Sequence, residues 1–224
     1  MNTLDDFYNR SFEKVINNKM LYYNYEFPWG EVEAYIRDML SIPVKDFIDY
    51  DILLETKESI TPKDVFQFSN LEACTGKICH VLAEAGNPGV KFAQAGELLL
   101  NDGKKRKETA YIKYGENQLK TATALGLLYE LSNTYFLSCI GIYYERLSAD
   151  DQKKLVTRLF LRSKLIARLI KASSLATVDA RQFLYMLSES TYIRRKTNLK
   201  HVLKFLNSSD EFDFSDIINH ISFP

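Results

Sequence analysis

The sequence predicts a mostly helical protein that contains one short β-hairpin. Apolar residues recur at the three- and four-residue spacing of amphipathic helices along most of the chain. Two stretches, residues 90–125 and 177–207, each have the pattern of a short helix, a tight turn and a longer helix. Between them, residues 127–137 have the pattern of two short strands around a polar dipeptide. The predicted fold class is therefore mostly α with a small β-hairpin wing, arranged as a tandem winged helix-turn-helix preceded by an N-terminal helical domain.

The composition is that of an ordinary soluble globular protein, with 224 residues of which 46% are hydrophobic and 26% are charged. No apolar run approaches the roughly 20 residues that a membrane-spanning helix needs, and the acidic N-terminal decapeptide does not resemble a secretory signal. Cys74, Cys79 and Cys139 have no CxxC spacing, and only three histidines accompany them. We expect a cytoplasmic protein without membrane contact, zinc site or nucleotide cofactor.

The net charge of zero conceals an uneven distribution along the chain. Residues 1–70 hold 7 Lys and Arg against 13 Asp and Glu, and residues 71–209 hold 22 against 12. Residues 210–224 hold 4 acidic residues and no Lys or Arg. A basic middle between acidic ends is the charge pattern expected of a segment that binds a polyanion such as nucleic acid.

Residues 1–70 have the pattern of an acidic, helical interaction domain. Apolar spacing predicts helices near residues 7–16, 30–40 and 46–54, although the last could also be a strand. The polar stretch over residues 59–70 marks the end of this domain. Because it is acidic, we expect it to face a protein partner or a second copy of the chain rather than DNA.

One string in this domain resembles the metal site of nucleases of the PD-(D/E)xK type. Asp51, Glu55 and Lys57 supply two carboxylates that could hold Mg²⁺ and a lysine that could help to activate water. Asp51 lies only four residues before Glu55, however, which is too close for the usual strand-turn-strand arrangement. Three such residues also recur by chance in a charged chain, and we assign no catalytic residue.

Residues 71–147 contain three expected helices followed by the hairpin. Gly86–Gly89 separates the first helix from the second, and Gly126 ends the third. Helix, turn, helix and hairpin in this order indicate a winged helix, with the third helix as the recognition helix. The expected elements are helices over residues 71–85, 90–100 and 108–125 and strands over residues 127–131 and 134–137.

A basic run, Lys104, Lys105, Arg106 and Lys107, precedes the third of these helices. It is well placed for DNA phosphates, contacts that set affinity and register rather than sequence choice. A merely solvated turn is the alternative interpretation. On the helix itself the spacing of four polar residues places them on one face, where the lysines would hold phosphates and the asparagine would reach a base edge. These residues are Lys113, Asn117, Lys120 and Thr121.

Residues 148–207 have the pattern of a connector helix followed by a second helix-turn-helix. Ser148 is a suitable N-cap for a helix over residues 151–172, whose Lys and Arg residues, including Arg158, are expected on the exposed side. Ser190 is predicted to be the N-cap of the longer helix that follows.

This longer helix carries the polar residues of a recognition helix on one face. Arginine matches the two acceptors of guanine and asparagine matches adenine, each with two hydrogen bonds. The alternative is a solvated basic face on a surface helix, and the similar unit upstream favours DNA binding. The residues are Thr191, Arg194, Arg195, Asn198 and His201. The chain closes with an acidic tail, residues 208–224, whose apolar residues are expected to pack back on the protein.

Two segments resemble the paired helix-turn-helix modules of bacterial restriction–modification and related phage-defence proteins. The first is YGEN at residues 114–117 running into LGL at 125–127, and the second is STYIRRKT at 190–197 running into LKFL at 203–206. The resemblance covers roughly residues 71–207. It implies winged-helix DNA binding and supplies no catalytic residue.

From these patterns we expect a protein that binds double-stranded DNA as a recognition or regulatory component of such a system. Two alternatives stay open. A restriction endonuclease or its subunit would use Asp51, Glu55 and Lys57 and would cleave DNA with Mg²⁺. A winged-helix docking subunit of a larger chromosome or defence complex would keep the fold but show little affinity for DNA alone.

Overall fold

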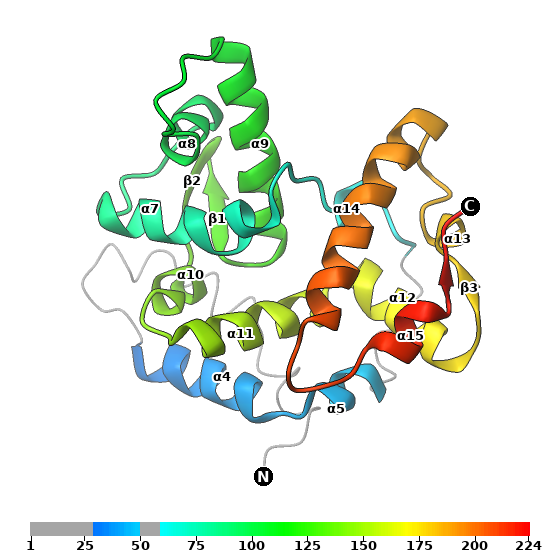
Figure 1. Cartoon of the computed structure of the whole chain (residues 1–224). Coiled ribbons are helices and arrows are strands. Elements are labelled where there is room, and N and C mark those ends of the chain that lie inside the picture. The colour runs from blue at the N-terminus through cyan, green and yellow to red at the C-terminus, as the bar shows by residue number, and fades with distance from the viewer. Residues whose placement is uncertain (1–28, 50–58) are drawn as a thin grey trace. The chain divides into compact units, whose positions relative to one another are not determined.

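The computed structural model describes residues 29–49 and 59–224, and this part of the chain is mostly helical (Figure 1). It contains one antiparallel two-stranded sheet, which confirms the prediction of a mostly α fold with a small hairpin. Within these ranges, no helix is both long enough and apolar enough to cross a bilayer. The prediction of a helix or strand over residues 46–54 extends beyond the described residues, and the helix predicted near residues 7–16 lies outside them.

The described part of the chain folds as two compact units. The first comprises residues 29–38 and 67–152, and the second comprises residues 39–49, 59–66 and 153–224. The sequence prediction divided the chain after residues 70, 147 and 207.

The elements of each unit have the following bounds. The first unit contains a π-helical turn (Ala73–Lys77), α7 (Ile78–Glu84), α8 (Phe92–Leu99), α9 (Glu108–Ala124), β1 (Leu128–Leu131), β2 (Thr134–Leu137) and α10 (Cys139–Tyr144). The second contains α5 (Val44–Asp49), a 3-10 turn (Pro62–Asp64), α12 (Lys164–Leu175), β3 (Val178–Asp179), α13 (Ala180–Phe183), α14 (Glu189–Asn207), α15 (Ser215–Asn219) and β4 (Ile221–Ser222). Helices α4 (Trp29–Ser41) and α11 (Ala149–Arg162) contribute residues to both.

The hairpin follows from local backbone preferences. Ser132 and Asn133 both have positive φ, 51° and 59°, as the two central residues of a type I′ turn require. This turn sets the register that pairs Leu131 with Thr134. Val90 joins β2 from the other side, because its backbone N–H and C=O each form a 2.9 Å hydrogen bond with Tyr135. The hairpin is thus tied to the segment that leads into α8.

Helices α8 and α9 cross at two glycines. A Cβ on Gly115 would lie 1.9 Å from the carbonyl oxygen of Phe92, and a Cβ on Gly96 would lie 2.1 Å from the carbonyl oxygen of Tyr111. Only hydrogen in place of a side chain allows such a close approach of two backbones. The crossing determines which face of α9, the predicted recognition helix of the first unit, packs against α8.

An exposed histidine links α7 to the end of α10. His80 Nδ1 lies 3.0 Å from Glu145 Oε2, and its Nε2 lies 3.4 Å from Glu84 Oε1. The hydrogen bond with Glu145, followed by the charge of Glu84, raises the pKa of His80 above its ordinary value of 6.5.

The raised pKa predicts a small loss of stability above neutral pH. Protonated His80 stabilises the folded state, so its contribution is fully present below the ordinary pKa and is lost as the pH rises through the raised one. Between about pH 5.5 and about pH 8, the urea concentration at the denaturation midpoint should therefore decrease more for the wild type than for His80→Gln. An equal change in both proteins would contradict this assignment.

The second unit is organised around a buried arginine. The side chain of Arg158 is 1% exposed and donates to Glu211 Oε2 at 2.6 Å and to Glu211 Oε1 at 2.9 Å. It also donates to the carbonyl oxygens of Leu40 and Ile42, both at 3.0 Å. The prediction that Arg158 lies on an exposed face is therefore wrong. The residue is buried because carbonyls and a carboxylate from distant segments pair with its charge.

The helical region after Ser148 differs from prediction in its continuity. Ser148 caps it as expected, since its Oγ accepts a 3.2 Å hydrogen bond from Asp151 N. The helix predicted over residues 151–172 is interrupted at Ser163, where α11 gives way to α12. The Ser163 hydroxyl donates to the carbonyl oxygen of Phe160 at 2.6 Å, a local bond that competes with continued helix.

The second predicted helix-turn-helix is present as α13 and α14, but without a following hairpin. After α14 the chain forms α15 and β4, and β4 pairs in parallel with β3. Between residues 59 and 224 the only antiparallel sheet is the β1–β2 hairpin. The hairpin predicted for the first unit is therefore present, whereas residues 153–224 form no hairpin that could be a second wing. The tail packs back as predicted, with Phe214 fully buried.

Candidate nucleic-acid interface

The basic run between α8 and α9 forms an ordered loop held by one of its own residues. Arg106 binds both carboxylate oxygens of Asp102 at 2.6 Å. Its backbone N–H donates to the Tyr111 hydroxyl at 3.3 Å, and that hydroxyl donates to the carbonyl oxygen of Lys104 at 3.2 Å. The guanidinium of Arg106 holds the pKa of Asp102 well below its ordinary range. Arg106 therefore stabilises the loop, and the phosphate contact predicted for it would require breaking its ion pair with Asp102.

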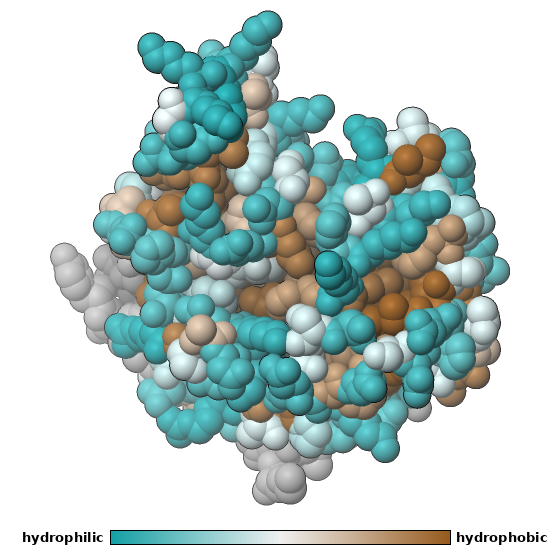
Figure 2. Space-filling model, viewed as in Figure 1, coloured by the Kyte–Doolittle hydropathy of each residue, from teal (hydrophilic) through white to brown (hydrophobic). Residues whose placement is uncertain are grey.

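The three lysines of this loop face solvent. Lys104, Lys105 and Lys107 are all exposed. Figure 2 shows hydrophilic side chains projecting from the end of the first unit where α8 and α9 are joined in Figure 1. Ammonium groups on a loop of defined shape are suited to phosphate oxygens, which need charge more than directional matching.

The outward face of α9 is less basic than predicted. Lys113 is exposed, but Asn117 is only 9% exposed, so the prediction that it lies on the outer face is wrong. Lys120 is exposed and pairs with Glu116 at 2.6 Å, and its ammonium lies 5.7 Å from the centre of the Phe92 ring. Thr121 lies one turn after Asn117 on the same side of α9, and its hydroxyl donates to the carbonyl oxygen of Gln67 at 2.7 Å. The segment around Gln67 therefore covers this side, and the outward placement predicted for Thr121, which is 2% exposed, is also wrong. This helix offers few groups that could read bases.

Helix α14 lies in the most basic part of the second unit. Residues 153–209 hold 13 Lys and Arg against 2 Asp and Glu, so the basic charge of the chain is concentrated here. Between residues 190 and 207 there is no acidic residue. The one Glu of the helix, Glu189, pairs with Arg181 at 3.0 Å. Because its outer face has no carboxylates of its own, positive charge accumulates along α14.

The exposed face of α14 is rotated from the predicted one. Arg194 and His201 are exposed as expected, whereas Thr191, Arg195 and Asn198 are half-buried at its edge. Arg195 donates to the carbonyl oxygen of Phe66 at 3.4 Å. Burial, and then the charge of Arg194, lowers the pKa of Arg195. The sequence prediction missed the other exposed residues of this face, which are Ile193, Thr197, Lys200 and Lys204.

The start of α14 also differs from the predicted one. The helix begins at Glu189, so Ser188 occupies the N-cap position and the prediction of Ser190 is wrong. The Ser188 hydroxyl donates to Thr191 Oγ1 at 3.0 Å, and the Arg194 guanidinium lies 3.5 Å from the same oxygen. The absence of acidic residues over 190–207 would have identified the missed lysines from sequence.

The C-terminal residues lie along one edge of α14. Lys196 Nζ donates to the carbonyl oxygen of Pro224 at 2.8 Å, and Lys200 lies 4.9 Å from the centre of the Phe223 ring. Lys196 is therefore engaged within the protein, and the solvent-exposed face of the helix runs from Arg194 to Lys204.

Asp51, Glu55 and Lys57, the candidate nuclease site, lie outside the described residues. Within those residues, no cluster of three or more His, Cys, Asp and Glu side chains is arranged to hold a metal ion. The three cysteines are buried, and desolvation raises the pKa of each thiol. Because the thiolate is the nucleophilic form, none is activated for catalysis.

Comparison of the chain with protein-family models, with curated proteins and with solved structures finds no match.

Proposed function

We propose that the protein binds double-stranded DNA through the outer face of α14. The observation that carries this proposal is the exposed stretch from Arg194 to Lys204, which presents Arg, Thr, Lys and His side chains and no carboxylate. Arg194 is the residue best suited to a guanine, because arginine reads both of its major-groove acceptors. Lys200 and Lys204 would hold phosphates on either side of the groove.

We further propose that residues 71–137 form a winged helix whose lysine loop contributes phosphate contacts. Three helices followed by a hairpin, with Val90 bridged to β2, support this assignment. Exposed Lys104, Lys105 and Lys107 would contact the DNA backbone. The role that the sequence resemblance implies, a recognition component of a bacterial restriction or phage-defence system, is part of the same proposal.

The proposal predicts salt-dependent DNA binding that weakens when α14 loses charge. Fluorescence anisotropy with a labelled duplex of about 30 base pairs, at about 50 to 200 mM salt, should give a steep fall of affinity. Replacing Lys200 and Lys204 by glutamine should flatten the slope of log K against log salt by about 2, because each lost phosphate contact removes roughly 0.9. It should also weaken binding at every salt concentration.

The matched control removes the same charge elsewhere. Lys45 in α5 and Lys91 at the start of α8 are both exposed, and the pair of glutamine variants should leave slope and affinity unchanged. Replacing Lys104, Lys105 and Lys107 together by glutamine tests whether the first unit contributes to DNA binding. No binding by the wild type at the lowest salt concentration would overturn the proposal.

A second candidate function is the docking of a protein on the α8–α9 hairpin. Leu98 in α8 is 38% exposed and Ile112 in α9 is 36% exposed. Exposed apolar side chains on both helices, together with the pairing of Lys120 in α9 with Glu116, favour a protein partner over phosphate at this hairpin. This function gains support if the loop-lysine variants leave DNA binding unchanged.

A further inference from the structure

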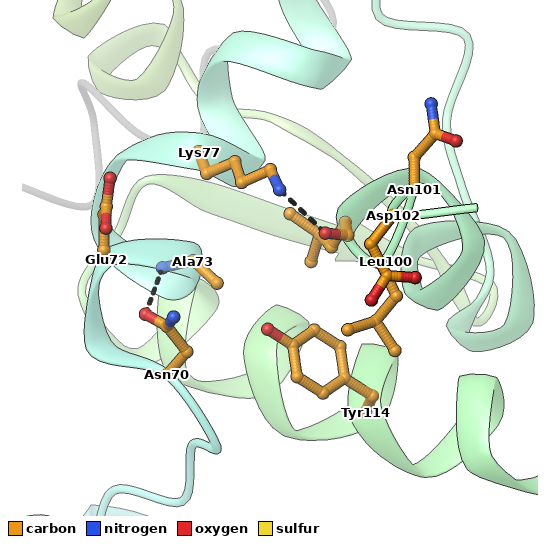
Figure 3. Close-up of a pocket in the computed structure, with 9 residues that line it drawn as sticks. Asn70, Glu72, Ala73, Lys77, Leu100, Asn101, Asp102 and Tyr114 are labelled. Carbon is orange, nitrogen blue, oxygen red and sulfur yellow. Dashed lines mark hydrogen bonds between the residues drawn. The ribbon is translucent and has the colours of Figure 1, made fainter. Parts of the chain in front are cut away.

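A pocket of about 300 Å³ lies within the first unit, between the π-helical turn, the end of α8 and the start of α9. This volume is at the lower end of the range for ligand sites, which suits a small molecule. Figure 3 shows Tyr114 at one wall, with Lys77 and Asn70 reaching in from one side and Asp102 lying on the other. Leu99 and Leu100 supply apolar surface.

Three hydrogen-bond donors lie on the side of this pocket that Glu72 also lines (Figure 3). Lys77 Nζ donates to the carbonyl oxygen of Leu99 at 2.8 Å, which uses one of the three donors of an ammonium. Asn70 Oδ1 accepts from Ala73 N at 3.1 Å, so its amide nitrogen has donors for another group. Burial raises the pKa of Tyr114, whose hydroxyl therefore keeps its proton. Three donors, one of them charged, are suited to a carboxylate.

Acceptors gather on the opposite side. Asp102 binds Arg106 through both oxygens at 2.6 Å and accepts from Lys104 N at 3.1 Å, so a ligand ammonium would share this carboxylate with Arg106. The carbonyl oxygens of Leu99 and Leu100 end α8, where the helix dipole is negative. A ligand ammonium is the group that these acceptors favour.

The wall of the pocket has an unusual backbone. Ala73–Lys77 is a π-helical turn, a rare form that is found frequently at functional sites. It places Ala73 and Lys77 together on the side of the pocket. The turn is therefore an observation independent of the side-chain chemistry.

We propose that this pocket binds a free α-amino acid, with its carboxylate on Lys77, Asn70 and Tyr114 and its ammonium against Asp102 and the carbonyl end of α8. The ammonium competes with Arg106 for Asp102, and Arg106 holds the loop that carries the exposed lysines. Occupancy therefore loosens the loop and lowers affinity for DNA. This last step rests on the proposed function, whereas binding of the amino acid does not.

Isothermal titration calorimetry of the full chain with each of the twenty L-amino acids tests the proposal directly. At least one should bind, and sodium acetate and methylammonium chloride, which each supply one of the two charged groups, should bind far more weakly. Tyr114→Phe removes only a hydroxyl and should weaken binding about 10-fold or more, as expected for a hydrogen bond to a charged group. Lys77→Met should abolish it.

The result that overturns the proposal is an absence of heat for all twenty amino acids, or an affinity that neither variant changes. Because Lys77 also caps α8, the Tyr114→Phe variant keeps the test valid if Lys77→Met fails to fold. Anisotropy with the duplex and saturating amino acid should show weaker DNA binding, and unchanged binding would overturn the coupling. Amino-acid binding by a protein that binds no DNA would support the pocket and refute the proposed function.

Discussion

Replacing Gly115 with alanine is expected to lower the free energy of unfolding by about 3 kcal/mol or more, at the upper end for overpacking. The new Cβ would lie 1.9 Å from the Phe92 carbonyl oxygen and 2.8 Å from the Gly96 nitrogen. Both atoms belong to backbone, so no side chain can rotate to make room. The two helices would have to separate along their whole contact, which urea denaturation followed by circular dichroism would measure.

Gly30 in α4 is the matched control for this substitution. A Cβ built on Gly30 meets no heavy atom within 4 Å. Alanine is favoured over glycine in helices by about 1 kcal/mol, so Gly30→Ala should be neutral or stabilising. Similar destabilisation by both substitutions would show that the α8–α9 crossing is not the cause. Gly115→Ala should also alter the lysine loop, because that loop joins the two helices.

Replacing Arg158 with methionine is expected to cost about 3–5 kcal/mol, the range for removing one partner of a buried ion pair. Methionine fills much of the same volume, so the loss reports on charge and hydrogen bonding rather than on a cavity. Glu211 would lose its bidentate partner, and the carbonyls of Leu40 and Ile42 would lose a donor. Chemical denaturation of the variant provides the measurement.

Arg37 provides the comparison that isolates burial. It pairs with Glu33 one turn away, but its side chain is 71% exposed, whereas that of Arg158 is 1% exposed. Exposed pairs contribute roughly 0 to 1 kcal/mol, so Arg37→Met should have a small effect. If Arg158→Met cost no more than Arg37→Met, the buried pair would not be an organising contact of the second unit.

The hairpin and the third helix of the first unit were predictable because their determinants are local. Ser132 and Asn133 tolerate positive φ, and Gly126, at φ 78°, ends the helix before β1. The start of α14 was less predictable, because Ser188 and Ser190 are equally good caps by residue type. Glu189 adopts helical geometry and pairs with Arg181, a contact that spacing alone does not reveal.

The candidate site was predictable in kind but not in detail. The concentration of Lys and Arg after residue 153 and the run Lys104–Lys107 are visible in the sequence. Which members face solvent is not visible, since Arg106 is held by Asp102 and Arg195 by the carbonyl oxygen of Phe66. Asn117 was assigned to the wrong face of α9 because apolar spacing does not reveal that the segment around Gln67, which is 54 residues from its hydrogen-bond partner Thr121, covers this side of the helix.

The sequence by itself determined the order of helices and strands, the turn of the hairpin and the uneven distribution of charge. Only the tertiary structure decided which charged side chains are buried and which are exposed. A helix or a turn depends on groups within a few residues, whereas the groups that surround Arg158 lie 53 to 118 residues away along the chain. An arginine can be buried only where such distant carboxylates and carbonyls converge, because an unpaired charge is costly to remove from water.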